Sequence, residues 1–440
     1  MCGITGIFDV GARGAPHIDA LRGMAQAMSD SLTHRGPDSS GVWDDENTPI
    51  ALGHRRLAIV DLSSHGDQPM HSPSGRYVAA YNGEIYNHLD LRKRLENEGH
   101  SAGWNGHSDT ETLLAAIDVW GLEKALQAAS GMFAFALWDK QQKELFLARD
   151  RVGEKPLFYG THDGSLLFAS ELKSICVFPG FNRAIDHDAA ALFLRYSYVP
   201  APLSIFKKVS KLMPGQIARF GRPGVAPELA NYWTLDQTIS ETAPARASGT
   251  TLQSSADRIE DALTQVVSSQ MISDVPIGAF LSGGIDSSLI TALMQKVSAK
   301  PVKTFSIGFE DERFDEARHA AEVAKHLGTE HREMILTERD ILEVAPSIAT
   351  IYDEPFADSS LLPTTLLSRM TREHVTVSLS GDGGDEMFAG YNRHVHGPKL
   401  WSHIERTPKF ARPAVGKLAA LGQRVLSSSP QRASAVLKVL

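Results

Sequence analysis

The first half of the chain alternates apolar runs of strand length with segments of helical periodicity. In the helical segments, apolar residues return every three or four positions, which is the spacing of one helix face. Strands of an antiparallel kind mixed with helices predict a layered α/β domain. We expect strands at 1–8, 51–60, 77–81, 132–138 and 144–149, and helices at 18–32, 89–98 and 110–120.

The second half shows a different pattern, in which strands and helices alternate one by one. This order predicts a parallel, doubly wound sheet, whose ligands gather at the carboxyl ends of its strands. We expect helices at 256–271, 285–294 and 315–327, and strands at 275–281, 302–309 and 375–379.

The two patterns are separated by a stretch of low periodicity. Residues 190–233 include several prolines and are expected to wrap the joint, and residues 236–256 are rich in Thr, Ser, Ala and Gly with few apolar anchors. That composition is typical of an exposed linker. We therefore expect one domain at 1–235, a linker at 236–256 and a second domain at 257–440.

Composition narrows the class of protein. The chain has 440 residues and a formal net charge of −8, which disfavours a general nucleic-acid binder. Only Cys2 and Cys176 are cysteines, as is usual in a reducing compartment. No secretory signal and no membrane-spanning run is visible, so we expect a cytoplasmic protein with no membrane partner. Its oligomeric state, including a homodimer, stays open.

Charge is uneven near the C-terminus. Residues 399–440 hold eight Lys or Arg and one acid, Glu405, so this segment is near +7 and the rest near −15. We interpret this segment as a solvated helical face rather than as a nucleic-acid or membrane patch.

A Gly-Ser loop follows the expected strand at 275–281. Two glycines let a backbone approach a ligand closely, hydroxyls add donors, and the next helix presents free N–H groups to an anion. No Gly-Lys-Ser/Thr is present, which excludes a Walker-type loop. The loop resembles the pyrophosphate loop of the ATP pyrophosphatase superfamily, whose members split ATP into AMP and pyrophosphate. Its residues are Leu281, Ser282, Gly283, Gly284, Ile285, Asp286, Ser287 and Ser288.

Cys2 gains meaning from its position. Initiator methionine is usually removed before a small residue, which would leave Cys2 with a free α-amine beside its thiol. Such an amine titrates near ~7.7–8 and can serve as the base for a nucleophile on its own residue.

Five ordered motifs in the first half strengthen this interpretation. They resemble the class II glutamine amidotransferase domain, which has an N-terminal-nucleophile (Ntn) hydrolase fold of two sheets between helix layers (α/β/β/α). The motifs are Cys2-Gly3-Ile4, His34-Arg35-Gly36-Pro37-Asp38, His54-Arg55-Arg56-Leu57, Asn82-Gly83-Glu84-Ile85-Tyr86-Asn87 and Ser108-Asp109-Thr110-Glu111. A further family pattern, Asp150 to Leu157, lies at the back of this domain.

The resemblance assigns roles for glutamine hydrolysis. Cys2 would be the nucleophile, and the Asn82 side chain and Gly83 N–H would form the oxyanion hole. Arg56 would pair with the α-carboxylate of glutamine, while Glu84 and Asp109 would hold its α-ammonium. The family register alone selects Arg56 over Arg55, since strand alternation puts them on opposite faces.

Two further strand ends would complete the ATP site. One is Ser306-Ile307-Gly308-Phe309, where the family uses the backbone, at Ile307, against adenine. The other runs from Ser380-Gly381 through Asp382 to Glu386, and is acidic where phosphate must bind. Mg²⁺ resolves this conflict, and Asp286 and Asp385 are the expected ligands. Asp382 stands where asparagine synthetases often have Glu, a residue linked to acyl-adenylate formation.

Together the halves resemble the glutamine-hydrolysing asparagine synthetase family. The resemblance implies that ammonia from glutamine amidates a carboxylate, aspartate, activated by MgATP as an acyl-AMP. It runs from Cys2 to about Tyr391; a downstream Lys of the family has no match here. Because apolar periodicity still runs at 433–440, we expect a truncated helix there.

The acceptor is the least defined part of this prediction. The stretch 352–360 resembles relatives from surface-polysaccharide genes about as well as it does housekeeping synthetases. Glu354 or Asp358 would suit the ammonium of aspartate, whereas Ser359, Ser360 and Thr364 would suit a uronic acid. These charges favour aspartate. A glutaminase with a degenerate second domain and a non-catalytic nucleotide sensor are the alternatives, and release of pyrophosphate distinguishes all three.

Overall fold

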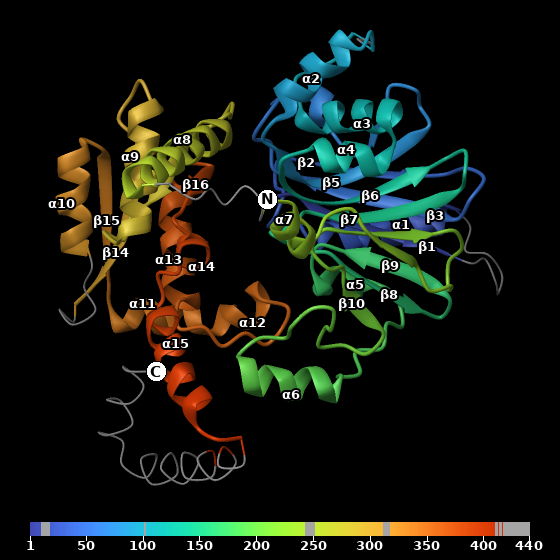
Figure 1. Cartoon of the computed structure of the whole chain (residues 1–440). Coiled ribbons are helices and arrows are strands. Elements are labelled where there is room, and N and C mark those ends of the chain that lie inside the picture. The colour runs from blue at the N-terminus through green and yellow to red at the C-terminus, as the bar shows by residue number, and fades with distance from the viewer. Residues whose placement is uncertain are drawn as a thin grey trace.

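The computed structural model describes residues 1–9, 18–100, 103–242, 251–310, 317–409, 412 and 416. Two regions with different sheets lie side by side in it (Figure 1). Within the described residues, no helix is long and apolar enough to cross a membrane. The segment 433–440, predicted to be a truncated helix, lies outside the described residues, as does most of the basic segment 399–440 beyond Lys409.

The N-terminal region is built on two antiparallel six-stranded sheets. The first sheet has the order β10 (Val209–Lys211), β8 (Phe158–His162), β9 (Ser165–Ala169), β1 (Gly3–Phe8), β3 (Ile50–Arg56) and β2 (Ser39–Asp44). The second has the order β12 (Glu228–Asn231), β11 (Gln216–Phe220), β7 (Glu144–Arg149), β6 (Gly131–Asp139), β5 (Tyr77–Ile85) and β4 (Met70–His71).

Helices cover the outer face of each sheet, which gives four layers (Figure 1). Trp138 and Leu52 belong to the apolar core between the sheets, Met28 and Ile175 to the core under the first helix layer, and Leu114 to that under the second. This is the predicted α/β/β/α arrangement. The helices are α1 (Ile18–Asp30), α5 (Leu172–Val177) and α6 (His187–Tyr196) on the first sheet, and α2 (His88–Asn97), α3 (Asp109–Trp120) and α4 (Leu122–Ala128) on the second.

The stretch 190–233, which was expected to lack sustained periodicity, contains strands β10 to β12 and most of helix α6. Strands β8 and β9 and helix α5 lie just before it. None of these elements was predicted, because they are short and several have mixed apolar and polar faces. Within 236–256, helix α7 (Leu235–Thr242) buries no residue, and residues 243–250 lie outside the described part of the chain. The following helix, α8 (Leu252–Gln270), begins earlier than expected, behind a Thr251 capping box.

The C-terminal region has the predicted parallel sheet. Its order is β15 (Glu330–Leu336), β14 (Lys303–Phe309), β13 (Ile277–Phe280) and β16 (Val377–Leu379), with all pairs parallel. The chain first moves outward from β13 to β15 and then returns to the other side of β13. This reversal makes the β13–β16 boundary the switch point, where ligands of such sheets bind.

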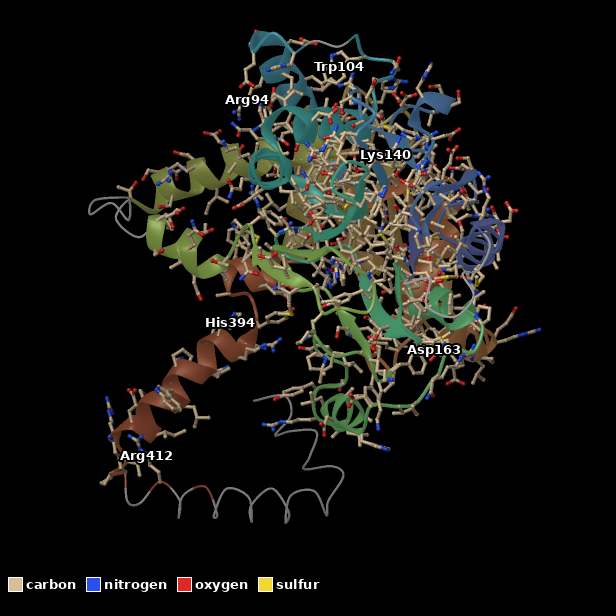
Figure 2. All side chains as sticks on the ribbon, turned by 90° about the vertical axis from the view of Figure 1, so that its right-hand side faces the viewer. Arg94, Trp104, Lys140, Asp163, His394 and Arg412 are labelled. Carbon is tan, nitrogen blue, oxygen red and sulfur yellow. The ribbon has the colours of Figure 1, made fainter. Side chains whose placement is uncertain are left out.

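Helices pack on this sheet from both sides. Val267 of α8 and Met294 of α9 (Ile285–Val297) pack against Ala279, while Met370 of α13 packs against Phe305. Figure 2 shows that α15, which carries His394, extends away from the densely packed side chains. The helices after α9 are α10 (Ala317–Leu327), α11 (Glu338–Val344), α12 (Ile348–Ile351), α13 (Leu361–Arg372), α14 (Gly384–Phe388) and α15 (Asn392–Arg406). Short 3₁₀ turns occur at Ala345–Ser347 in this region and at Ser64–Gly66 in the N-terminal region.

Candidate functional site

Cys2 lies immediately before β1 and at the edge of a pocket in the N-terminal region. The backbone N–H of Leu57, just beyond β3, donates to the Cys2 sulfur over 3.4 Å. The thiol also contacts the Leu57 carbonyl oxygen at 3.7 Å. Burial raises the pKa of the Cys2 thiol, so the group needs a base before it can act as a nucleophile.

An amine is present beside this thiol. Burial lowers the pKa of the Met1 amino group to about 5, helped by the positive charges of Arg35 and Lys155 and opposed by the Cys2 thiolate. The Met1 amine is therefore uncharged at neutral pH and can accept a proton.

Asn82 and Gly83 lie in β5, opposite Ala134 and Phe133 of β6. The sequence placed them after a strand that ended at Tyr81, but β5 continues to Ile85. Asn82 is 1% exposed, and its Nδ2 has no hydrogen-bond partner among the described residues. A buried donor left unpaired costs about 1–3 kcal/mol, so this amide is suited to meet an oxygen of a ligand. A Cβ on Gly83 would meet the Met132 carbonyl and Phe133, which gives the glycine a packing role as well.

Arg56 faces the pocket, and Arg55 turns away from it toward Thr33 and Asp30. This is the alternation that strand geometry requires. The buried Arg56 guanidinium donates to the Ser63 carbonyl over 2.8 Å and to Asp67 over 3.0 Å. It also donates to the carbonyl of Asp61, so the segment after β3 wraps around it.

Two acids, Glu84 and Asp109, also line the pocket. Asp109, the first residue of α3, is buried and accepts hydrogen bonds from the Tyr81 hydroxyl at 3.0 Å and the Ile85 N–H at 2.8 Å. Burial raises the pKa of Asp109. Burial and then the charge of Asp109 raise the pKa of Glu84 to about 8. A bound cation would relieve this unfavourable placement of two carboxylates.

The pocket thus brings together every residue that the sequence predicted for the glutamine site. Its lining consists of Met1, Cys2, Arg56, Leu57, Ile59, Val60, Gly66, Gln68, Tyr81, Asn82, Gly83, Glu84, Ser108, Asp109, Thr110, Met132 and Lys155.

Sequence reasoning missed two supports of this pocket. Arg35 donates to the Cys2 carbonyl oxygen over 2.8 Å and pairs with Glu171 at 2.6 Å. Burial opposes ionisation of Glu171, but His34, Arg35 and Lys173 outweigh it and lower its pKa to about 2. Arg35 was part of a quoted motif and carried a signal, whereas Glu171 precedes α5 with no pattern to mark it.

The Gly-Ser loop lies after β13, at the switch point of the second sheet. Its own hydroxyls support it, since Ser282 Oγ and Ser287 Oγ are 3.0 Å apart. Gly283 has φ +80°, and a Cβ there would lie 2.7 Å from the Ala320 nitrogen of α10. A Cβ on Gly381 would lie 2.7 Å from the Ser287 nitrogen, which brings Ser380 and Gly381 beside the same loop. Leu281 is buried under α10, while Ser282 and Gly284 are exposed and Ser288 is half-buried.

The carboxylates expected to hold a metal come from the two sides of this switch point. A Cβ on Gly384 would lie 2.7 Å from Asp286 Oδ2, and Asp385 is the next residue. Neither carboxylate forms an ion pair with a described residue, and no group of three or more metal-binding side chains occurs among those residues. Two free carboxylates fit a hard cation that takes its other ligands from phosphate and water. Asp382 is exposed and accepts from Ser380 Oγ at 2.9 Å.

Ile307 lies in β14 opposite Met334 of β15. Because β13 pairs with β14 only as far as Phe305, no strand of the described residues pairs with β14 beside Ile307 on the β13 side. Its position is therefore open toward the loop that follows β13.

Part of the expected acceptor segment lies at the contact between the two regions. Glu354 pairs with Lys211 at 2.5 Å and accepts from the Ile205 N–H at 2.7 Å. These bonds leave Glu354 less available for a substrate than the sequence suggested. Asp358 is exposed and accepts from the Ser360 N–H at 2.7 Å.

Comparisons with known proteins match both regions. The family described as Glutamine amidotransferase domain matches residues 1–233, and the family Asparagine synthase matches residues 258–438. A Methanocaldococcus jannaschii protein, named as a candidate glutamine-hydrolysing asparagine synthetase, is 35% identical over 95% of this chain and 81% of its own length. Asparagine synthetase [glutamine-hydrolyzing] 1 of Bacillus subtilis is 35% identical over 96% of this chain and 63% of its own.

The chain spans less than two thirds of several of these relatives. A Mycobacterium bovis protein with the same candidate name is 37% identical over 95% of this chain, which covers 64% of that protein. The two matched families occur in the same order as the two regions of the structure. The chain belongs to the glutamine-hydrolysing asparagine synthetase family.

Proposed function

We propose that this chain releases ammonia from glutamine in its N-terminal region and uses it to amidate aspartate activated by MgATP. The products are asparagine, glutamate, AMP and pyrophosphate. The observation that carries the proposal is the unpaired Nδ2 of Asn82 in the pocket that holds Cys2. A donor of this kind is what a glutaminase needs where the oxyanion forms.

The glutaminase half requires hydrolytic removal of Met1, which exposes the α-amine of Cys2. That amine takes the thiol proton, and the sulfur attacks the side-chain amide carbon of glutamine. Asn82 Nδ2 and the Gly83 N–H donate to the oxyanion. The amine returns its proton to the leaving nitrogen, so ammonia departs and a thioester remains for water to hydrolyse.

Arg56, Glu84 and Asp109 hold the substrate during these steps. Arg56 directs a guanidinium at the α-carboxylate, although it shares its donors with the carbonyls of Asp61 and Ser63. Glu84 and Asp109 accept the α-ammonium, whose positive charge favours their ionised forms.

The synthetase half places the phosphates of ATP over the loop from Leu281 to Ser288, beside Ser380 and Gly381, with adenine against the Ile307 backbone. Asp286 and Asp385 would hold Mg²⁺, which neutralises charge on the phosphates. Asp382 would act on the acceptor carboxylate, with a reach one methylene shorter than that of Glu.

The acceptor is tested by product formation. With glutamine, MgATP and aspartate, the enzyme should form glutamate, AMP, pyrophosphate and asparagine in equal amounts. Aspartate-independent glutamate without pyrophosphate would indicate a glutaminase with an inactive second region. If AMP formed with a uronic acid and not with aspartate, the acceptor would be the sugar acid. If neither ATP nor glutamine were turned over, the chain would be a non-catalytic nucleotide sensor.

Two properties of the whole protein remain predictions. We expect a cytoplasmic enzyme, and sedimentation velocity would decide between a monomer and a homodimer.

A further inference from the structure

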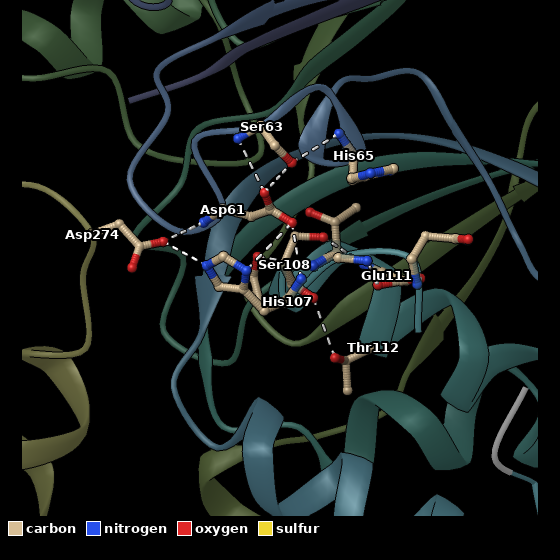
Figure 3. A network of polar contacts seen from close by, with 12 residues as sticks. Asp61, Ser63, His65, His107, Ser108, Glu111, Thr112 and Asp274 are labelled. Carbon is tan, nitrogen blue, oxygen red and sulfur yellow. Dashed lines mark hydrogen bonds and ion pairs between the residues drawn. The ribbon is translucent and has the colours of Figure 1, made fainter. Parts of the chain in front are cut away.

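Asp274 belongs to the C-terminal region but forms hydrogen bonds with residues of the N-terminal region. It lies in the turn between α8 and β13, and its backbone N–H donates to the Ile59 carbonyl over 2.9 Å. Its Oδ2 accepts from the Asp61 N–H at 2.7 Å and is 2.7 Å from His107 Nε2 (Figure 3). The bond from His107 lowers the pKa of Asp274, so the carboxylate is charged at neutral pH.

The residues that Asp274 contacts come from two separate segments of the pocket wall. Ile59 and Asp61 follow Arg56 and lie in the segment that wraps around the guanidinium. His107 directly precedes Ser108, the N-cap of α3, and Asp109, and both of these residues line the pocket.

Asp61 already ties these two segments together inside the N-terminal region. Its Oδ2 accepts from the His107 N–H at 2.9 Å, and its Oδ1 accepts from the Ser63 hydroxyl at 2.5 Å (Figure 3). The Asp61 side chain is 2% exposed, and Gly106 permits this approach because a Cβ there would collide with the carboxylate. Asp274, from the C-terminal region, also forms hydrogen bonds with both of these segments.

The first segment also supplies the contact to the nucleophile. The Leu57 N–H donates to the Cys2 sulfur, and Leu57, Ile59 and Val60 all line the pocket. A shift of this segment would therefore move Arg56 and the surroundings of Cys2 together. Holding such groups in place before the ligand arrives reduces the ordering cost of binding.

We propose that Asp274 is a positioning residue for glutamine, by which the synthetase region completes the glutamine site. Its carboxylate fixes residues 59–61 against His107, so that the walls bearing Arg56 and Asp109 keep their separation. The proposal rests on the proposed glutaminase function. It predicts that glutamine affinity depends on contact between the two regions.

The test compares Asp274→Ala, Asp274→Asn and, as a matched control, Asp261→Ala, which removes an exposed acid from α8 in the same region. Because Asp274 is partly exposed, Asp274→Ala should raise the KM for glutamine by about three- to tenfold. Its kcat should stay within about twofold, since no reacting atom is touched. Asp274→Asn keeps an acceptor for the Asp61 N–H and should lie between Ala and wild type. Activity with ammonium salt in place of glutamine should be unchanged.

Hydrogen–deuterium exchange gives a readout that does not depend on catalysis. In Asp274→Ala, the amides of residues 57–62 and 103–108 should exchange faster than in wild type, with both segments affected together. Unchanged exchange there would overturn the proposal even if glutamine were not the substrate. Wild-type turnover with an unchanged KM in Asp274→Ala would overturn it too, while absence of wild-type glutaminase activity would instead refute the proposed function.

Discussion

The two candidate sites differ in how much of each is enclosed by protein. In the pocket that holds Cys2, Asn82, Arg56 and Asp109 are 1%, 6% and 7% exposed. Around the Gly-Ser loop, Ser282, Gly284 and Asp382 are exposed. The first site is a pocket lined by buried polar side chains, and the second is a set of loops at the carboxyl ends of the parallel strands.

The contrast agrees with the chemistry that we propose for each site. An oxyanion that forms on one carbonyl is stabilised best by donors fixed in advance away from water. Phosphates carry their charge from the start, and backbone N–H groups at a helix N-terminus attract them even when exposed. The carboxylates Asp286 and Asp385 repel phosphate unless a cation joins them, so the second site needs its ligands to become complete.

The largest expected effect is the loss of glutamine hydrolysis when the nucleophile of the first site is removed. Cys2→Ala removes the nucleophile and should lower glutamine hydrolysis by about 10³-fold or more, because Cys2 is the only cysteine among the residues that line the pocket. Aspartate-dependent pyrophosphate formation with ammonium salt should persist. Mass spectrometry of the active wild type should show that Met1 is absent; full activity with Met1 retained would contradict the amine mechanism.

Substitutions at the second site should impair pyrophosphate formation without impairing glutamine hydrolysis. Asp286→Asn and Asp385→Asn each remove a charge that would bind the cation, and pyrophosphate formation should fall by about 10²-fold. Glutaminase turnover should stay within about threefold, because the two sites lie on different sheets. Asp257→Asn, an exposed change on α8, is the control. Parallel loss of both activities in a folded variant would show that the sites do not work independently.

The order of the elements around both candidate sites could be predicted from sequence, but how far protein encloses each site could not. The strand–loop–helix order around Ser282 and the position of Cys2 before a strand are local patterns, and local patterns survive in a single sequence. Bonds between distant segments leave no such trace. Arg35 with Glu171, Glu354 with Lys211, and Asp274 with His107 each join residues far apart in the chain. Only packing of the two regions shows that Glu354 is engaged in a contact between them.

The smallest expected effect concerns the ionisation of Glu84 when glutamine binds. Free Glu84 has a pKa of about 8, because it is buried and lies near Asp109. It is therefore mostly protonated at pH 7, where it cannot pair fully with the ammonium of glutamine. Binding must then release a proton, and release becomes easier as pH rises.

Glutamine affinity should accordingly increase from pH 6 to pH 8 and level off above the free-enzyme pKa. The slope cannot exceed about tenfold per pH unit for one proton, and a shallower slope is expected because Asp109 shares the ammonium. Calorimetry of glutamine binding to Cys2→Ala would measure this without turnover. The double variant with Glu84→Gln should bind more weakly and with a flatter pH dependence. If that variant kept the full slope, the titrating group would lie elsewhere in the pocket, and the raised pKa of Glu84 would have no part in substrate binding.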